Sequence, residues 1–174
     1  MIYLILFFVV VIIFLFSSKK FSPIPYFPSQ SIDIPLIIKA LKLNKDQTII
    51  DLGAGDGIVI FSAAQQSYKQ KLNTKFVAVE INPILVLILH FRRLFHPNKK
   101  KIEIIRDDIF KMNFNKQLKT TTIYLYISPW FLEKTIENCK IKIKKFSLVS
   151  YMYPIKSLKK KENFIQGKNK IFIY

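Results

Sequence analysis

The sequence has one cysteine and two histidines among its 174 residues. The single thiol, Cys139, excludes a disulfide framework within the chain and any cysteine-rich zinc or iron–sulfur site. His90 and His96 are too few for a histidine-built metal centre, so no metal is assigned. Acidic residues are also scarce, at 11 against 28 Lys and Arg. The apolar content of 51% excludes general disorder, and the length fits one domain.

The resulting net charge of +17 is typical of proteins that contact nucleic acid, anionic lipid or acidic partners. Only three of the basic residues are arginines: Arg92, Arg93 and Arg106. Phosphate recognition favours the bidentate fork of Arg, whereas Lys and Ile are both favoured by A/T-rich codons. A compositional bias of the genome therefore accounts for part of this charge.

The first residues form a membrane-like segment. Ile2 to Phe16 is unbroken apolar sequence, followed by Ser17, Ser18 and the pair Lys19-Lys20. As a helix, residues 1–18 would span about 27 Å against a hydrocarbon core of about 30 Å. We therefore expect a single-pass transmembrane anchor, with a cleaved signal peptide or a buried core segment as alternatives. The lysine pair on the C-terminal side places the body in the cytoplasm.

Residues 19–30 are predicted to be an extended linker, because three prolines lie between Phe21 and Pro28. From residue 31 to 174 we expect one domain in which strands alternate with helices. Helices are expected at Ile32–Leu43, Ile58–Tyr68 and Pro83–Phe95, and strands at Thr48–Leu52, Phe76–Glu80, Ile102–Arg106, Thr122–Ile127 and Phe146–Tyr151. This alternation predicts an α/β, Rossmann-like sheet that is mostly parallel. Extended pieces near Asn163–Ile165 and Ile171–Tyr174 predict an antiparallel hairpin at its C-terminal edge.

The most informative segment is Asp-Leu-Gly-Ala-Gly-Asp-Gly at residues 51–57, directly after the first strand. Its glycines allow a ligand to approach the backbone closely, and free N–H groups at the following helix would suit a negatively charged ligand group. The third glycine is one position too early for a G-x-G-x-x-G dinucleotide fingerprint. The two acids, Asp51 and Asp56, suit a ligand that carries an ammonium group.

Carboxylates also follow the next two strands. Glu80 can accept hydrogen bonds from ribose hydroxyls, and Asp107-Asp108 can accept from the exocyclic amine of a purine. Each acid alone could equally be a helix cap or a solvated loop residue. Together with the glycine loop they fit a nucleoside with an amino-acid tail, which is S-adenosylmethionine.

These motifs resemble class I S-adenosylmethionine-dependent methyltransferases, with residues 51–57 as motif I and residues 79–83 as the acidic loop after strand 2. The chain is most similar to the membrane-associated protein-lysine methyltransferases that modify ATP synthase c-subunit and adenine nucleotide translocase, and to their prokaryotic relatives. That similarity is carried by Pro-Tyr-Phe-Pro-Ser at 25–29, Asp-Ile-Phe-Lys at 108–111 and Tyr-Leu-Tyr-Ile-Ser-Pro at 124–129. It covers residues 25 to about 153.

The resemblance implies a role for each matching residue. Asp51, the loop backbone and Ser29 would hold the methionine moiety, Glu80 the ribose, and Asp108 with Ile109 the adenine. The implied cofactor-binding residues are Ser29, Asp51, Gly53, Ala54, Gly55, Gly57, Glu80, Asn82, Asp108 and Ile109. The residues implied at the reacting amine are Tyr26, Ser128, Pro129 and Trp130. Trp130-Phe131 departs from the family pattern, so the fit to substrate is the weakest inference.

Methyl transfer needs a neutral amine aligned with the sulfonium methyl group. An aromatic cage of Tyr26, Tyr124, Tyr126 and Trp130 could orient the amine of a lysine, although ordinary core packing also explains these side chains. No residue stands out as a general base. The implied partner is a protein substrate at or in the membrane, and the oligomeric state stays open.

Two other functions remain. Ser-Pro-Trp-Phe at 128–131 is similar to the Ser-Pro-Pro-Tyr loop of enzymes that methylate cytosine N4 in nucleic acid, and the charge agrees. The second Pro is missing, and nucleic acid is not the expected partner. A non-catalytic, membrane-tethered module is the other alternative, with the ten lysines of residues 140–170 as a patch for anionic lipid.

Overall fold

The structure, a computed structural model, describes residues 1–7, 10, 26–112, 120–143 and 145–174. Its strands form one seven-stranded sheet in the order β3-β2-β1-β4-β5-β7-β6. The strands are β1 (Gln47–Leu52), β2 (Lys75–Glu80), β3 (Ile102–Arg106), β4 (Thr120–Leu125), β5 (Ser147–Tyr151), β6 (Asn163–Gln166) and β7 (Lys170–Ile173). The helices are α2 (Ile34–Leu41), α3 (Ile58–Lys69), α4 (Pro83–Leu94) and α5 (Pro129–Lys142), with short 3-10 turns η1 (Ser31–Asp33), η2 (Lys99–Lys101) and η3 (Lys156–Lys161).

The strands β1 to β5 are parallel, and β7 is antiparallel to both β5 and β6. This confirms the predicted mostly parallel sheet with an antiparallel C-terminal edge. β1 is central, with β2 on one side and β4 on the other. The chain therefore reverses its direction of winding beside β1, and the crevice at the carboxyl ends of such strands is where open α/β sheets bind ligands.

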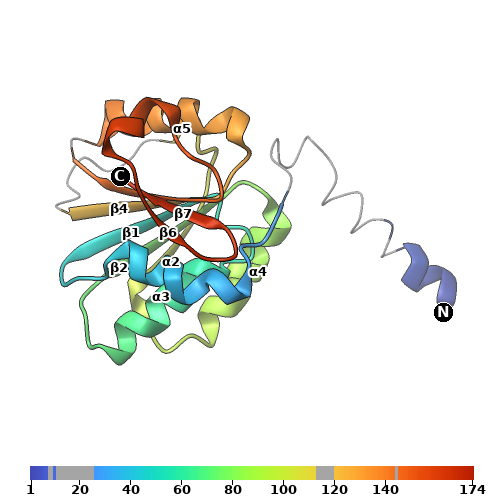
Figure 1. Cartoon of the computed structure of the whole chain (residues 1–174). Helices are drawn as coiled ribbons and strands as arrows, with labels where there is room; N and C mark the ends of the chain where they lie inside the picture. Colours follow the sequence, from blue (N-terminus) through green and yellow to red (C-terminus); the bar gives the residue numbers. More distant parts are fainter. Residues whose placement is uncertain (8–9, 11–25, 113–119, 144) are drawn as a thin grey trace.

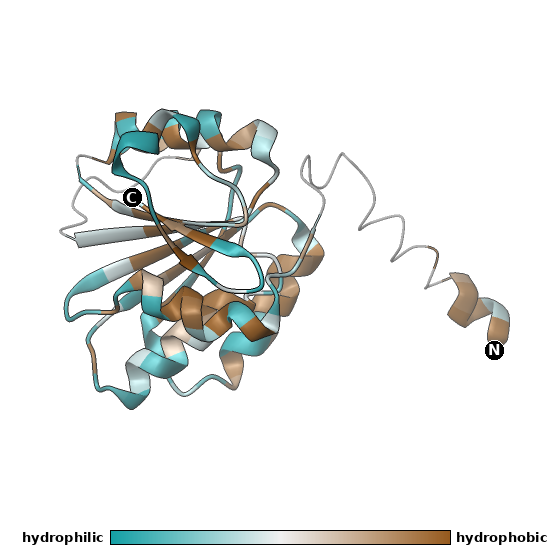
Figure 2. Cartoon of the chain, in the orientation of Figure 1, coloured by the Kyte–Doolittle hydropathy of each residue, from teal (hydrophilic) through white to brown (hydrophobic). Residues whose placement is uncertain are grey.

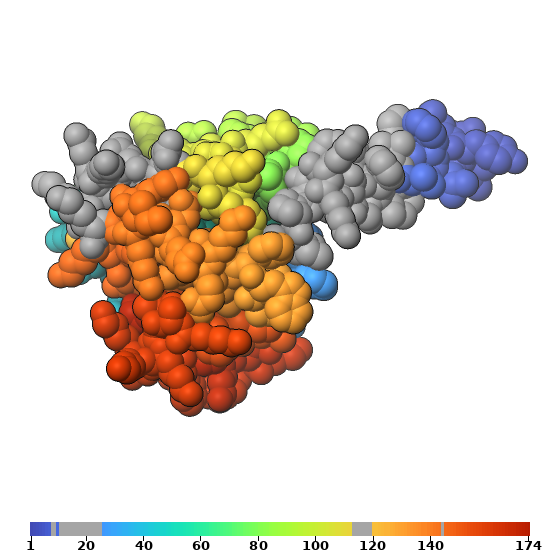
Figure 3. Space-filling view, turned by 90° about the horizontal axis from the view of Figure 1, so that it is seen from above, coloured from blue at the N-terminus to red at the C-terminus, as the bar shows by residue number. Residues whose placement is uncertain are grey.

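Helices cover both faces of the sheet. In Figure 1, α5 lies on one face, and α2, α3 and α4 lie on the other. β1 is buried along its whole length, and its side chains alternate between two cores: Ile49 packs with the α2–α3 cluster and Ile50 with the α5 cluster. Figure 3 looks onto the α5 layer (orange), which lies between the C-terminal strands (red) and the region of β3 (yellow). Burial on both faces explains the continuous apolar runs of these strands.

The helix expected over Ile32–Leu43 is shorter than predicted. It begins as η1 and ends at Leu41, because Lys42 adopts a left-handed conformation with φ 48°. Asp33 anchors this region: its carboxylate accepts hydrogen bonds from the Lys168 and Asn169 backbone N–H groups and from the Tyr151 hydroxyl, at 2.7, 2.9 and 2.7 Å. The segment after the linker is thus fixed to the β6–β7 turn, and Figure 2 shows the mostly hydrophobic α2 beside it.

The predicted anchor lies largely outside the described residues, which leave out residues 8–9 and 11–25. Residues 2–7 are helical. Among the helices of the described ranges, none has both the length and the apolar character needed to cross a bilayer.

Candidate functional site

The predicted site residues come together at the carboxyl edge of the sheet. Asp51 lies near the end of β1, Glu80 ends β2, and Asp108 follows β3. The parallel pairing of β1, β2 and β3 brings these three ends side by side. Three carboxyl groups from separate strands therefore lie at one edge of the sheet.

The glycine loop has the backbone that its sequence suggests. Gly53, Gly55 and Gly57 all have positive φ, at 83°, 58° and 80°. A side chain would also collide with neighbours: a Cβ on Gly55 would lie 2.6 Å from the Tyr26 ring, and a Cβ on Gly57 would lie 2.5 Å from Leu89. The loop needs glycine both for conformation and for space.

The expectation of free N–H groups in this loop is wrong for Gly53, Ala54, Gly55 and Gly57. The N–H groups of Gly53 and Ala54 both donate to the Val79 carbonyl at 2.9 Å. The Gly55 N–H donates to Glu80 Oε2, and the Gly57 N–H donates to the Ala54 carbonyl, each at 2.8 Å. The loop is therefore held by its own hydrogen bonds, and it offers a ligand close approach rather than a nest of donors.

The Glu80 carboxylate connects the glycine loop to the segment before α4. It is 5% exposed, and besides Gly55 it accepts hydrogen bonds at Oε1 from the backbone N–H groups of Ile81 and Asn82, each at 2.9 Å. Three backbone donors fix the carboxylate between the glycine loop and the start of α4. This is the position from which it would accept the hydroxyls of a ribose.

Asp51 is the buried charge of the site, at 2% exposure. Burial raises the pKa of its carboxyl group well above the usual range, and the nearby carboxylates of Glu80 and Asp56 raise it further. A cation brought beside Asp51 would relieve this cost, because an opposite charge favours the ionised form. The ammonium group of an amino-acid ligand is such a cation.

Asp56, by contrast, already has partners. Its carboxylate forms an ion pair with Arg92 at 3.0 Å and accepts a hydrogen bond from the Ile58 N–H at 3.1 Å. Arg92 also donates to the Asp56 carbonyl at 2.6 Å. The Tyr26 hydroxyl donates to the same carboxylate, and burial together with Asp56 raises the pKa of Tyr26 to about 12. The expectation that Asp56 receives the ligand's ammonium group is therefore not supported by its contacts.

Tyr26 and Ser29, at the end of the linker, lie beside the glycine loop. The Tyr26 ring lies against Gly55, and the Ser29 hydroxyl forms a 2.8 Å hydrogen bond with the hydroxyl of buried Tyr124. These side chains, with Asp51, line an enclosed space of only about 20 Å³. The methionine moiety of a cofactor needs more room, and the Tyr26 ring lies against the glycine loop that would receive it.

The remaining predicted cofactor residues have mixed placements. Asp108 accepts a hydrogen bond from the Phe110 N–H at 2.9 Å, and Ile109 is buried beside it. Asn82 is 2% exposed, and its side-chain oxygen caps α4 by accepting from the N–H groups of Ile84 and Leu85. The structure thus shows Asn82 as a helix cap at the edge of the site.

A second pocket of about 310 Å³ adjoins the loop region, because Phe27 and Tyr126 line both spaces. The other residues that line it are Ile127, Ser128, Pro129, Met152 and Tyr153. The rings of Tyr126 and Tyr153 are stacked at 6.5 Å, and Tyr151 meets Tyr126 edge-on at 4.9 Å. The pocket is therefore aromatic on two sides.

The predicted aromatic cage is only partly assembled. Tyr126 lines the pocket, but Tyr124 is 2% exposed and lies on the cofactor side with Tyr26. Trp130 does not line the pocket; it is 83% exposed because it lies on the solvent side of the first turn of α5. The pocket instead uses Phe27 and Tyr153, which were not predicted from the sequence. The alternation of tyrosines at 151 and 153 was the available signal.

Parallel winding around β1, a glycine loop after that strand and carboxylates after β1, β2 and β3 define the class I, Rossmann-like methyltransferases. The chain belongs to the ribosomal RNA adenine dimethylase family, whose sequence profile matches residues 29–164. In the solved structures, an RNA methyltransferase from Salinibacter ruber in complex with S-adenosyl-L-homocysteine has the same fold, with a TM-score of 0.65 at 16% identity over 84% of this chain and 91% of that one.

Two curated proteins are similar to parts of the chain. The lysine N-methyltransferase of the ATP synthase c-subunit from Caenorhabditis elegans is 33% identical over 98 residues, which are 53% of this chain and 48% of that protein. A probable ribosomal RNA small subunit methyltransferase A of Methanosphaera stadtmanae is 31% identical over 81 residues, 47% of this chain and 27% of that protein. The chain thus spans less than half the length of either relative.

By family and fold the chain belongs to the S-adenosylmethionine-dependent methyltransferases, a class whose cofactor is S-adenosylmethionine. The donor set fits that group. Asp51 would face the ammonium, Glu80 would hold the ribose, and Asp108 would lie toward the base. The bound cofactor supplies the electrophilic methyl group.

Proposed function

We propose that the chain transfers a methyl group to the side-chain amine of a lysine in a membrane-associated protein. The observation that carries this proposal is the pocket beside the cofactor site, which is lined by Phe27, Tyr126 and Tyr153 and whose described residues include no ionisable side chain other than tyrosine. An apolar, aromatic pocket accepts the alkyl stem of a lysine and attracts its amine. The 33% identity to a lysine N-methyltransferase over 98 residues supports the same acceptor.

In methyl transfer, the main task of the protein is to align the two reactants. The amine must be neutral and in line with the methyl–sulfur bond, and holding two reactants in that geometry is a large catalytic contribution. Low polarity favours the neutral amine, because burial lowers the pKa of a lysine. Within the described residues, no carboxylate or histidine lines this pocket, so the proton of the lysine leaves to solvent before transfer.

The membrane part of the proposal rests on the apolar run Ile2 to Phe16 and the lysines that follow it. With the anchor at residues 1–18, the linker would place the catalytic body close to the bilayer on the cytoplasmic side. A substrate within that membrane would meet the pocket without diffusing through the cytoplasm.

A second candidate is methylation of an adenine amine in ribosomal RNA, which is favoured by the family profile and by the archaeal relative. The net charge of +17 would attract RNA. In this case the aromatic pocket would stack on an extruded base rather than receive an alkyl chain.

Incubating the full chain with methyl-labelled S-adenosylmethionine separates the two. The acceptors are membranes and ribosomal RNA from the same cells, offered separately, and the Asp51→Asn variant is the control. Label in a protein band that digestion and mass spectrometry assign to methyl-lysine supports the proposal. Label in RNA alone overturns it in favour of the second candidate.

A further inference from the structure

The outer face of α4 carries a stripe of exposed apolar side chains. Leu87, Phe91 and Leu94 on the helix and Phe95 just after it are 70%, 63%, 63% and 76% exposed. Their spacing of four, three and one residues places them within one arc of the helix surface. These four side chains are called the α4 stripe below. An exposed apolar stripe of this size on a folded domain marks an interaction surface.

Among the described residues, the α4 stripe belongs to neither core cluster and lines neither space of the candidate site. The opposite side of the helix packs into the protein through Leu85, Val86 and Leu89. The contacts of α4 with the site come from its Asn82 cap and from Arg92, which pairs with Asp56. Phe91 and Phe95 contact each other edge-on at 5.2 Å. The stripe is therefore an apolar surface outside the machinery described above.

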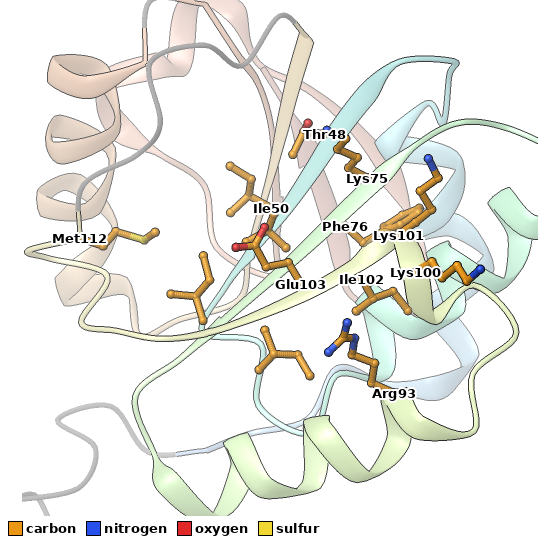
Figure 4. A pocket seen from close by; sticks show the side chains of 13 residues that line it. Thr48, Ile50, Lys75, Phe76, Arg93, Lys100, Lys101, Ile102, Glu103 and Met112 are labelled. Carbon is orange, nitrogen blue, oxygen red and sulfur yellow. The ribbon is translucent and has the colours of Figure 1, made fainter.

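The segment of sequence that carries the stripe has charge of one sign. Residues 81–101 contain no acid and five basic side chains: Arg92, Arg93, Lys99, Lys100 and Lys101. Figure 4 shows Arg93, Lys100 and Lys101 among the side chains that line a groove next to β3, which has a volume of about 620 Å³ and is also lined by Glu103. An apolar stripe bordered by cations is complementary to a surface of acyl chains and anionic headgroups.

We propose that α4 lies flat on an anionic phospholipid bilayer, with the α4 stripe in the interface and the neighbouring cations at the headgroups. Because Asn82 caps α4 next to Glu80, the N-terminal end of the docked helix lies at the carboxyl edge of the sheet. Docking therefore holds the cofactor crevice beside the membrane surface. This contact is separate from the N-terminal anchor and goes beyond the proposed methyl transfer, since it needs neither cofactor nor acceptor.

A fluorescent label on the full chain tests this contact directly. Leu94→Cys carries an environment-sensitive nitrobenzoxadiazole group, and Tyr68→Cys on α3, where Tyr68 is 52% exposed, is the matched control. The native Cys139 is fully buried and leaves little background labelling. Each labelled chain is mixed with vesicles of phosphatidylcholine, with or without phosphatidylserine, and then with vesicles that contain brominated acyl chains as quenchers.

The label at position 94 is expected to brighten severalfold with phosphatidylserine vesicles and to be quenched by brominated lipid, whereas the label at position 68 does neither. Adding Phe91→Ser should weaken the response at position 94 about tenfold in lipid concentration, because one aromatic side chain is lost from the interface. An equal response at both positions, or none at position 94, overturns the proposal. So does a lipid-independent brightening that rises with protein concentration, since that result assigns the stripe to a second copy of the chain.

Discussion

Replacing Asp51 with asparagine should stabilise the cofactor-free protein while it weakens cofactor binding. Asp51 is buried beside two other carboxylates, and its pKa is raised in the folded state. The folded protein therefore holds this proton more tightly than the unfolded chain, whose Asp pKa is about 3.9. Ionised Asp51 costs stability that grows as the pH rises above that value. Asparagine keeps the shape and removes the charge.

The effect on binding has the opposite sign. An ionised Asp51 would accept a charge-assisted hydrogen bond from the ammonium group of the cofactor, and such a bond contributes about 1.5–3 kcal/mol. Its loss corresponds to a dissociation constant about ten- to a hundredfold larger. Removing the Asp51 carboxylate thus lowers the affinity for the cofactor and raises the stability of the cofactor-free protein, as is common at functional sites.

Two measurements on the full chain check this prediction. Thermal unfolding without cofactor, between about pH 5 and pH 8, should show a higher melting temperature and a weaker decline with pH for Asp51→Asn than for the native protein. Calorimetric titration with S-adenosylhomocysteine gives the affinity. Asp46→Asn, in the exposed turn just before the same strand, is the control and should change neither. Unchanged affinity in Asp51→Asn, or a variant less stable than the native protein at about pH 8, would refute the reasoning.

Three further changes have defined outcomes. Gly57→Ala places an alanine in a left-handed conformation and against Leu89 and Phe61. The variant should lose about 2–4 kcal/mol of folding stability, and its melting temperature should fall by about 10 °C. A fall of less than about 2 °C, which is the size expected of an ordinary surface substitution, would contradict the packing. Tyr26→Phe removes the hydrogen bond to Asp56 that holds the ring over the loop, so stopped-flow binding of S-adenosylhomocysteine should be faster, and an unchanged association rate would show that Tyr26 does not gate entry. Burial alone would raise the pKa of Asp33, but the hydrogen bonds that its carboxylate accepts from Asn169, Tyr151 and Lys168 lower this pKa overall. The ionised carboxylate therefore stabilises the fold at neutral pH, and this contribution is lost as the pH falls through the lowered pKa. Asp33→Ala should cost about 3 kcal/mol at neutral pH in urea unfolding and less in acid, and equal costs at both pH values would contradict this account.

The parallel sheet was predictable because its signals are local. β1 is a short β-branched run that leads into glycines, and Pro83 marks the start of α4 as expected of a first-turn proline. β3 coincides with its predicted bounds, Ile102–Arg106. The C-terminal hairpin was also correct. In each case the residues that determine the element lie within it.

α5 was not predicted, although Leu132, Ile136 and Cys139 recur at helical spacing and are all buried. The Ser-Pro-Trp-Phe motif at its start favoured a loop and concealed that pattern. The partners of Asp56 could not be foreseen either, since Arg92 lies 36 residues further along the chain and no local signal joins them. The same holds for the N–H groups of Gly53, Ala54 and Gly55, which donate to a carbonyl and a carboxylate of the neighbouring strand. Long-range contacts of this kind depend on the assembled sheet.

The measurement that tests the account most directly is a calorimetric titration of the full chain with S-adenosylhomocysteine, with NADH as the competing nucleotide. The site described here predicts one saturable binding event per chain with S-adenosylhomocysteine, loss of affinity in Asp51→Asn and no binding of NADH. Heat with NADH but none with S-adenosylhomocysteine would contradict the assignment of the site at the carboxyl ends of β1, β2 and β3.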